Sequence, residues 1–411
     1  MDATGSRQPP SARPAPEPGR ANRLSPMRFV VGFGVVALLG DFVYEGARSV
    51  VGPYLATLGA SAAVVGVVTG AGEAVALVLR LASGPLSDRT RRPWPITIAG
   101  YAITMVAVPL LAATQLLWQA VLAVVGERFG KAVRSPAKAT MLAAASAGIG
   151  RGRAFSIQEA LDQIGAVAGP LLVAGMVALS GYRLGFAVLA VPGAVALVVL
   201  ALLRRAVPRP EAYESGPARP ASSAGGAASR WRFSRRFWGY GAFTALTMLG
   251  YATFAVLAFH LQVRHVLPSY QIPIVYAVAM GVDALAALGS GWVYDRIGLR
   301  GLIVLPVLAA VVPVLSFSTS AGLVWLGAVV WGAAMGIHES TMKAAVADLV
   351  PADRRGTGYG LFTTVYGLAW LAGSAVIGVL YGVSVGAVIV FVVVVQAVAL
   401  AAFLPLVLRQ R

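Results

Sequence analysis

Twelve long apolar segments constrain the fold of this chain more than any other feature. They lie at 28–57, 60–82, 94–114, 116–145, 155–180, 184–203, 237–263, 270–293, 300–318, 321–347, 357–381 and 384–408, and are numbered here as spans one to twelve. At about 1.5 Å of helical rise per residue, each is long enough to cross roughly 30 Å of hydrocarbon. The pattern predicts an all-α polytopic membrane protein with twelve transmembrane helices in a lipid bilayer.

Composition supports the membrane assignment. Of the residues, 58% are apolar and only 12% are charged, whereas a soluble chain carries about 25% charged residues. The net charge of +17 comes from basic residues in short loops and tails, which is typical of cytoplasmic loops and not of a nucleic-acid surface. No nucleic-acid partner is therefore expected. The absence of cysteine excludes disulfides and thiol chemistry.

Two polar segments predict how the chain is divided. Residues 1–27 are rich in Pro, Ala, Arg and Gly, a composition that buries too little apolar surface to fold, and we expect a disordered cytoplasmic tail. Residues 204–236 have a similar composition and are predicted to be a flexible cytoplasmic linker. It would join an N-terminal six-helix bundle, 28–203, to a C-terminal six-helix bundle, 237–408.

The basic residues predict the orientation. The tails, the linker and the loops after spans two, four, eight and ten are rich in arginine. The loops on the other side carry only Arg183, Arg264 and His265. Because cytoplasmic loops carry the excess of Lys and Arg, we expect both termini to lie in the cytoplasm. We also expect a multi-pass protein of the inner or plasma membrane that acts as a monomer. The two outer histidines, His260 and His265, are expected to be solvated.

A short charged motif occurs twice. It reads GPLSDRTRR at 84–92, after span two, and GWVYDRIGLR at 291–300, after span eight. Three positions are identical at one constant offset. They are Gly84, Asp88 and Arg89 in the first copy, which correspond to Gly291, Asp295 and Arg296 in the second. The repeat indicates two parallel six-span halves, which is a transporter arrangement.

The doubled motif resembles the signature loop of the major facilitator superfamily. Arg128 in span four resembles the family's membrane-embedded arginine, and Gly165-x-x-x-Gly169-Pro170 in span five resembles the start of a motif associated with antiporters. The resemblance covers nearly the whole chain outside the tail and linker. It implies two pseudo-symmetric six-helix bundles around a midplane site, with the two charged loops acting in gating. Pro170 is expected to bend or loosen its helix.

The chain departs from the family pattern at two places. Arg91 stands at the glycine position of the first motif, whereas Gly298 keeps it in the second. Val173 and Ala174 replace the glycine pair expected after Gly169-Pro170. The second departure weakens the inference of antiport.

Ionisable residues within spans are costly and mark candidate sites. In span one, Asp41, Glu45 and Arg48 share a helix face by their spacing, and Asp41 lies near mid-bilayer. A carboxyl group there suits proton coupling or recognition of a cation. The alternative is a structural Glu45–Arg48 pair. Glu73 in span two either faces span one or makes a helix contact beside nearby glycines.

Span four is basic, and span five is acidic. Arg128 is predicted to need a buried partner or to bind an anionic group. Lys131, Arg134 and Lys138 step towards the cytoplasm and are interpreted as positive-inside residues that extend to the interface. Asp162 is expected to be tied to a cytoplasmic-side arginine as part of helix packing.

The C-terminal half offers fewer candidates. Asp283 lies in the middle of span eight, and Glu339 lies in span ten beside His338. A histidine next to an acid suits a proton path. The alternative is a satisfied polar residue on a helix interface.

Enzyme motifs are absent from the sequence. It contains no phosphate-binding loop, no metal-ligand spacing and no nucleophile elbow, so neither an enzyme nor a cofactor or metal site is predicted. We predict a secondary transporter that moves a small molecule by alternating access, with proton-coupled efflux by antiport as the first choice. Proton symport or facilitated uptake of a metabolite is the alternative. A non-transporting membrane sensor is the alternative from another class.

Overall fold

A computed structural model describes residues 22–90, 93–146, 149–213, 233–350 and 355–408. The described residues form helices joined by short turns, without strands. Nine helical stretches among them are long and apolar enough to cross a membrane. Two of the nine, Arg153–Ala206 and Gln271–Ser316, each cover two predicted spans. The prediction of an all-α membrane protein is therefore confirmed, and the helices are consistent with twelve spans.

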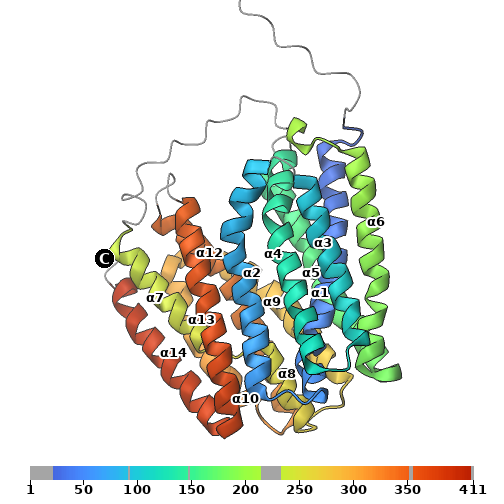
Figure 1. Ribbon diagram of the computed structural model, residues 1–411. Helices are drawn as coiled ribbons and strands as arrows, with labels where there is room; N and C mark the ends of the chain where they lie inside the picture. Colours follow the sequence, from blue (N-terminus) through green and yellow to red (C-terminus); the bar gives the residue numbers. More distant parts are fainter. Residues whose placement is uncertain (1–21, 91–92, 147–148, 214–232, 351–354, 409–411) are drawn as a thin grey trace, which may run out of the picture.

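The first half consists of helices that run between two ends of the molecule (Figure 1). They are α1 (Pro26–Thr57), α2 (Ala62–Thr90), α3 (Pro93–Leu110) with the short η1 (Leu111–Ala113), α4 (Leu117–Ser146), α5 (Arg151–Val188) and α6 (Ala190–Ala206). We call the end where α1 begins and α6 ends the basic end, and the other the opposite end. Ser25 caps α1 by accepting a hydrogen bond from the Arg28 amide, 3.4 Å away.

The second half is more interrupted. Its helices are α7 (Arg235–Leu249), α8 (Phe254–Val263), α9 (Gln271–Ile297), η4 (Gly298–Ile303), α10 (Val304–Ser316), α11 (Ala321–Glu339), α12 (Thr341–Leu349), α13 (Arg355–Val383) and α14 (Val385–Leu408). Predicted span seven is broken between α7 and α8, and span ten between α11 and α12. Gly298 ends α9 with a φ of +58°, a conformation that glycine adopts without steric cost.

One expectation about helix ends is wrong. The repeated motif was predicted to be a loop, but α2 continues to Thr90 and α9 to Ile297, so both copies begin on helices. Pro170 was predicted to bend or loosen its helix; α5 keeps helical backbone angles through it, and the bend itself stays a prediction. The break in α5 comes at Ser180 and Gly181.

The start of the predicted linker is structured. Residues 210–213 form the short helix η2 (Pro210–Tyr213). The Asn22 side chain donates to the Arg209 carbonyl at 2.8 Å, and the Tyr213 hydroxyl donates to the Leu24 carbonyl at 2.6 Å. These bonds hold the segment after α6 against the segment before α1. Most of the predicted tail and linker lies outside the described residues.

Glycines allow close helix packing within the first half. A side chain at Gly165 or Gly169 in α5 would collide with the backbone of Leu38 or Phe42 in α1. In the second half, Gly332 and Gly336 of α11 pack in the same way on Ala279 and Asp283 of α9. Small residues at such positions let membrane helices approach closely.

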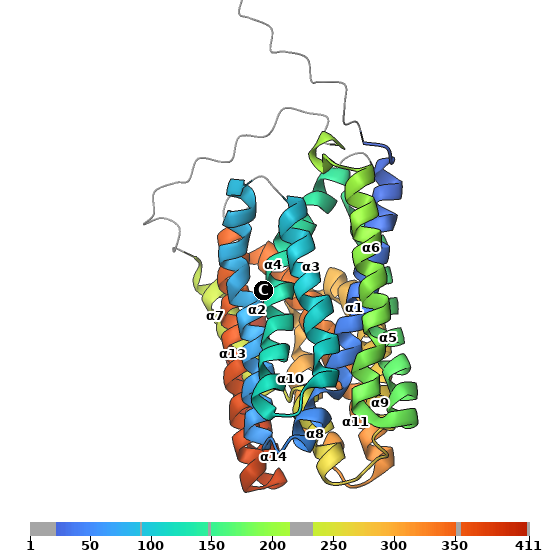
Figure 2. The same cartoon turned by 45° about the vertical axis from the view of Figure 1, so that its right-hand side comes forward.

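The halves meet mainly through α2 with α13, α5 with α9, and α1 with α8; α2 and α13 lie side by side in both views (Figures 1 and 2). Glycines again make the closest contacts: Gly52 faces the Ala255 carbonyl, and Gly66 faces the Ser374 carbonyl. Both glycines lie where α1 ends and α2 begins, so this packing closes the opposite end.

Candidate functional site

A chain of alternating charges crosses the first half inside the membrane-spanning part. Arg48 lies 3.6 Å from Glu45 and 3.5 Å from Glu73. Arg128 lies 2.7 Å from Glu73 and 3.2 Å from Glu127. Since α1, α2 and α4 each contribute side chains to it, this charge chain joins three helices. All five side chains are buried at about one-seventh exposure or less, so each charge requires its neighbours.

Tyr44 and Lys131 complete this charge chain. The Tyr44 hydroxyl lies 3.2 Å from Glu73 and accepts a hydrogen bond from Arg128. The Lys131 amine lies 3.5 Å from the centre of the Tyr44 ring, a position that favours a cation–π contact. Lys131 was predicted to extend to the membrane interface, and the structure instead places it over a ring inside the bundle. Sequence analysis missed its role, although its spacing of three residues from Arg128 was a usable signal.

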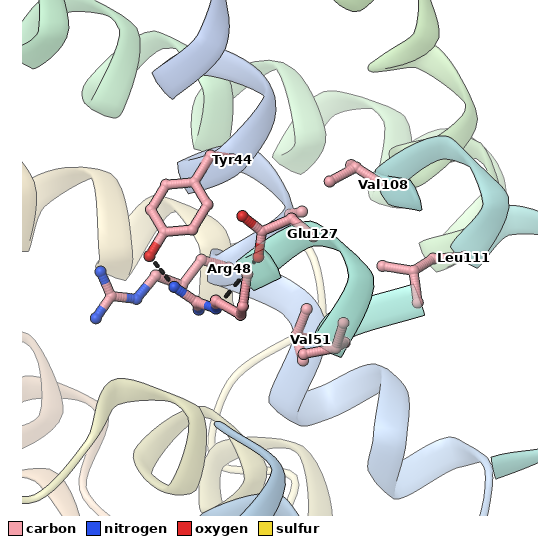
Figure 3. Close-up of a pocket in the computed structure, with 9 residues that line it drawn as sticks. Tyr44, Arg48, Val51, Val108, Leu111 and Glu127 are labelled. Carbon is pink, nitrogen blue, oxygen red and sulfur yellow. Dashed lines mark hydrogen bonds and ion pairs between the residues drawn. The ribbon is translucent and has the colours of Figure 1, made fainter. Parts of the chain in front are cut away.

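The cavities beside the charge chain are small. One lies between α1, α3 and α4 and is lined by Tyr44, Arg48 and Glu127 together with Val108 and Leu111 (Figure 3). The other lies between the halves, with Trp370 on its wall. They offer a water-sized molecule about 10 and 20 Å³, which is room for about one water each. Neither of these two cavities therefore holds a solute larger than water.

A second group of charges lies nearer the basic end. Asp41 is 3.9 Å from Arg134, and Asp162 is 3.5 Å from Lys138. The partner of Asp162 is thus a lysine and not the expected arginine. The Asp41 side chain is 26% exposed, so it is held more loosely and is more accessible than the acids of the charge chain.

Two hydrogen bonds join acids across the two halves. The Tyr276 hydroxyl of α9 donates to Glu45 of α1 at 2.5 Å. The Gln163 amide of α5 donates to Asp283 of α9 at 3.4 Å. Sequence analysis could not identify Gln163 or Tyr276 as partners, because nothing in the spacing relates helices from different halves.

The remaining residues of the second half differ in burial. Asp283 is 3% exposed, whereas Glu339 is exposed. Neither ring nitrogen of His338 has a hydrogen-bond partner in the described part of the chain, so the interpretation as a satisfied polar residue is wrong. His260 was expected to be solvated, but it is buried and its Nδ1 lies 2.9 Å from the Tyr381 hydroxyl.

The two copies of the repeated motif lie at the ends of α2 and α9. The side chains of Gly84, Asp88 and Arg89 lie outside the described residues. Asp295 and Arg296 are exposed near the end of α9, and the Arg296 guanidinium lies 3.2 Å from the centre of the Trp292 ring. Within the described ranges, no group of three or more His, Asp or Glu side chains is arranged to hold a metal ion.

Comparison with known proteins identifies the family. The family model described as Major Facilitator Superfamily matches residues 33–374. The chain belongs to the major facilitator superfamily. An uncharacterized protein of Mycobacterium tuberculosis is 52% identical over 379 residues, which cover 92% of each chain. An uncharacterized MFS-type transporter of Methanocaldococcus jannaschii is 25% identical over 359 residues, covering 85% of this chain and 88% of that one.

Solved structures agree on the fold. A mutant of the nucleoside transporter NupG matches with a TM-score of 0.75 at 16% identity, covering 92% of this chain and 99% of that one. A bacterial homolog to the human lysosomal transporter Spinster, inward-facing and unoccupied, matches with a TM-score of 0.75 at 16% identity, covering 94% and 98%. The resemblance inferred from the doubled motif is confirmed. The family and fold make this superfamily member a multi-pass secondary transporter of a small molecule.

Proposed function

We propose that this transporter exports its cargo in exchange for protons, with Asp41 as the principal proton-carrying residue and Asp283 as a second. The observation that supports Asp41 best is its position: it lies within α1, is one-quarter exposed, and has its nearest cation 3.9 Å away. A carboxyl group with weak and accessible partners can exchange protons within the transport cycle. Glu45, Glu73 and Arg128 would instead fix the shape of the first half.

Asp283 offers a way to couple protons to movement of the halves. It accepts a hydrogen bond from Gln163 across the interface, and a bond to an ionised carboxylate is roughly twice as strong as one to a neutral group. Protonation of Asp283 therefore weakens a contact between the halves. It thereby favours their separation at this point.

The packing of α5 on α1 supports the outward direction of transport. Gly165 and Gly169 pack α5 tightly on α1, as the part of the antiporter-associated motif that this chain retains would require. Proton symport or facilitated uptake remains the second candidate, because the same acids serve either direction. A non-transporting sensor has no described feature in its favour.

Orientation and location complete the proposal. The arginine-rich loops favour a cytoplasmic basic end, with both termini in the cytoplasm and the protein acting as a monomer in the plasma membrane. Gly291, Asp295 and Arg296, with the corresponding residues of the first motif, would then take part in gating at the cytoplasmic side.

The test compares accumulation in a deletion strain with that in strains expressing the wild type or Asp41→Asn. Extracts are screened by mass spectrometry after exposure to drugs and metabolites. For an exporter, the deletion strain retains compounds that the wild type removes, and Asp41→Asn retains them to the same degree. A protonophore abolishes the wild-type difference. Glu211→Gln, an exposed acid in η2, is the matched control and behaves as wild type.

Three outcomes contradict parts of the proposal. Lower accumulation in the deletion strain indicates uptake and removes efflux. Full concentrative transport by Asp41→Asn removes the role of that carboxyl group. A wild-type difference that survives the protonophore removes proton coupling altogether.

A further inference from the structure

Three acids without a basic partner in the described ranges lie on α5, α9 and α11, and α9 packs against both of the other two helices. Asp283 is buried, and its Oδ1 atom has no hydrogen-bond partner among the described residues. Glu159 of α5 and Glu339 of α11 are exposed. None of the ion pairs found in the described ranges includes any of these three carboxylates. This contrasts with the first half, where arginines or lysines compensate the buried acids.

The electrostatic surroundings of Asp283 are negative. Glu159 lies one helical turn before Gln163, whose side chain bonds to Asp283, and Glu339 lies three residues after Gly336, which packs on the Asp283 backbone. The other ionisable group of α11, His338, packs against tyrosines and lacks a hydrogen bond in the described structure. A low-dielectric region bordered by one sign of charge attracts mobile ions of the other sign. Here it attracts cations.

An aromatic column borders these acids. It consists of Tyr251, His338, Tyr366 and Trp370, whose successive ring centres are 5.2, 6.1 and 5.7 Å apart. His338 of the column immediately precedes Glu339 on α11, and Gly336 of the same helix packs on the Asp283 backbone, so the column and the two acids lie close together. Aromatic faces attract organic cations, most strongly where water is excluded.

We propose that the acids Asp283, Glu339 and Glu159, together with the aromatic column, form a binding site for an organic cation. This inference rests on the proposed proton-coupled transport and names its class of cargo. Arg48 also reaches the column, with its guanidinium 5.8 Å from the Trp370 ring. Its charge is compensated by Glu45 and Glu73, so it does not oppose binding of a cation.

The site gives proton exchange a simple balance of charge. A protonated Asp283 is neutral, and it releases its proton when an organic cation arrives. The carboxylate then neutralises the cation, and no net charge is left in the buried site. Cargo and proton thus compete for one carboxyl group, which is the requirement for their exchange.

Two probes of the same shape and opposite charge test whether the site prefers cations to anions. Binding of tetraphenylphosphonium and of tetraphenylborate to the purified full-length protein is measured at pH 8. We expect the phosphonium to bind at least tenfold more tightly than the borate, and its affinity to fall at pH 5.5. Asp283→Asn is expected to weaken phosphonium binding at least tenfold and Tyr366→Ala several-fold, while Glu211→Gln binds as the wild type does.

The opposite results would overturn the proposal. Equal or tighter binding of the borate means that the site is not selective for cations, and undetectable phosphonium binding means that no such site exists. If Asp283→Asn does not fold, Glu339→Gln, an exposed residue, carries the same comparison. Because these measurements use no gradient, they can fail while the protonophore and Asp41→Asn experiments still show proton coupling.

Discussion

At the scale of single residues, pairing explains how the first half tolerates so many charges in its interior. Glu45, Arg48, Glu73, Arg128 and Glu127 alternate in sign along one continuous chain. A buried ion pair adds little net stability, but loss of one partner leaves an uncompensated buried charge. The charge chain is therefore expected to be sensitive to single changes and tolerant of matched ones.

Arg128→Gln tests this expectation. The Arg128 side chain is 5% exposed and bonds to Glu73 at 2.7 Å, so its loss should destabilise the protein by about 3–5 kcal/mol. The measurement is thermal unfolding of the purified protein in detergent. Lys138→Gln removes a partner that lies 3.5 Å from Asp162 and is 17% exposed, so it should cost less than Arg128→Gln.

A double variant supplies the internal control for that prediction. Glu73→Gln combined with Arg128→Gln removes both charges of the closest pair, so it should be more stable than Arg128→Gln alone. If the double variant loses the sum of the two single effects, the pair is not coupled. The explanation of the charge chain would then be wrong.

Sequence spacing indicated which residues of one helix share a face, but it could not indicate which helices they meet. Asp41, Glu45 and Arg48 were grouped correctly on one helix. The partnerships of Lys131 with Tyr44 and of Gln163 with Asp283 depend on the rotation and tilt of separate helices. Those are set by packing over the whole bundle, which no local pattern records.

At the scale of helices, the length of each apolar segment predicted where helices lie, but an unbroken apolar segment did not predict an unbroken helix. The predicted spans match the observed helices, yet spans seven and ten are broken at 250–253 and at Ser340. Apolar residues lie on both sides of the break at 250–253, so hydropathy gives no sign of that break. Tertiary contacts satisfy the backbone there: the Trp331 indole donates to the Ala252 carbonyl at 2.8 Å.

Glycine contacts between helices of different halves should control the conformational equilibrium. A methyl group at Gly52 would collide with the Ala255 carbonyl, and such overpacking costs about 1–3 kcal/mol. Gly52→Ala should therefore favour the state in which the opposite end is open. Because the chain lacks cysteine, a single Val51→Cys reports on this, with labelling by an impermeant maleimide from that side.

The labelling rate of Val51→Cys should rise about tenfold in the Gly52→Ala background, since about 1.4 kcal/mol changes an equilibrium tenfold. Gly175→Ala is the matched control, because a methyl group there meets nothing within 4 Å. An unchanged rate with Gly52→Ala, or an equal rise with Gly175→Ala, would contradict the role of the glycine contact.

At the scale of the whole molecule, the two halves divide the chemistry unequally. The buried acids of the first half are compensated by arginine or lysine, whereas buried Asp283 of the second half has no basic partner in the described ranges. The repeat in the sequence predicted two related halves and gave no hint of this asymmetry. It arises because the duplicated motif lies at helix ends, while the residues that differ lie in the middle of the spans.

Alternating access requires the closed opposite end to open in each cycle. Tyr182 of the first half and Gln262 of the second are joined there by a hydrogen bond of 2.5 Å. In Tyr182→Cys combined with Gln262→Cys, a short bifunctional thiol reagent should stop transport of a cargo identified in the accumulation screen, and cleavage of the link by reductant should restore it. Either single variant treated alike should keep its activity, since one thiol cannot bridge the halves. Full transport by the cross-linked protein would mean that this end does not open, and that cargo leaves by another route.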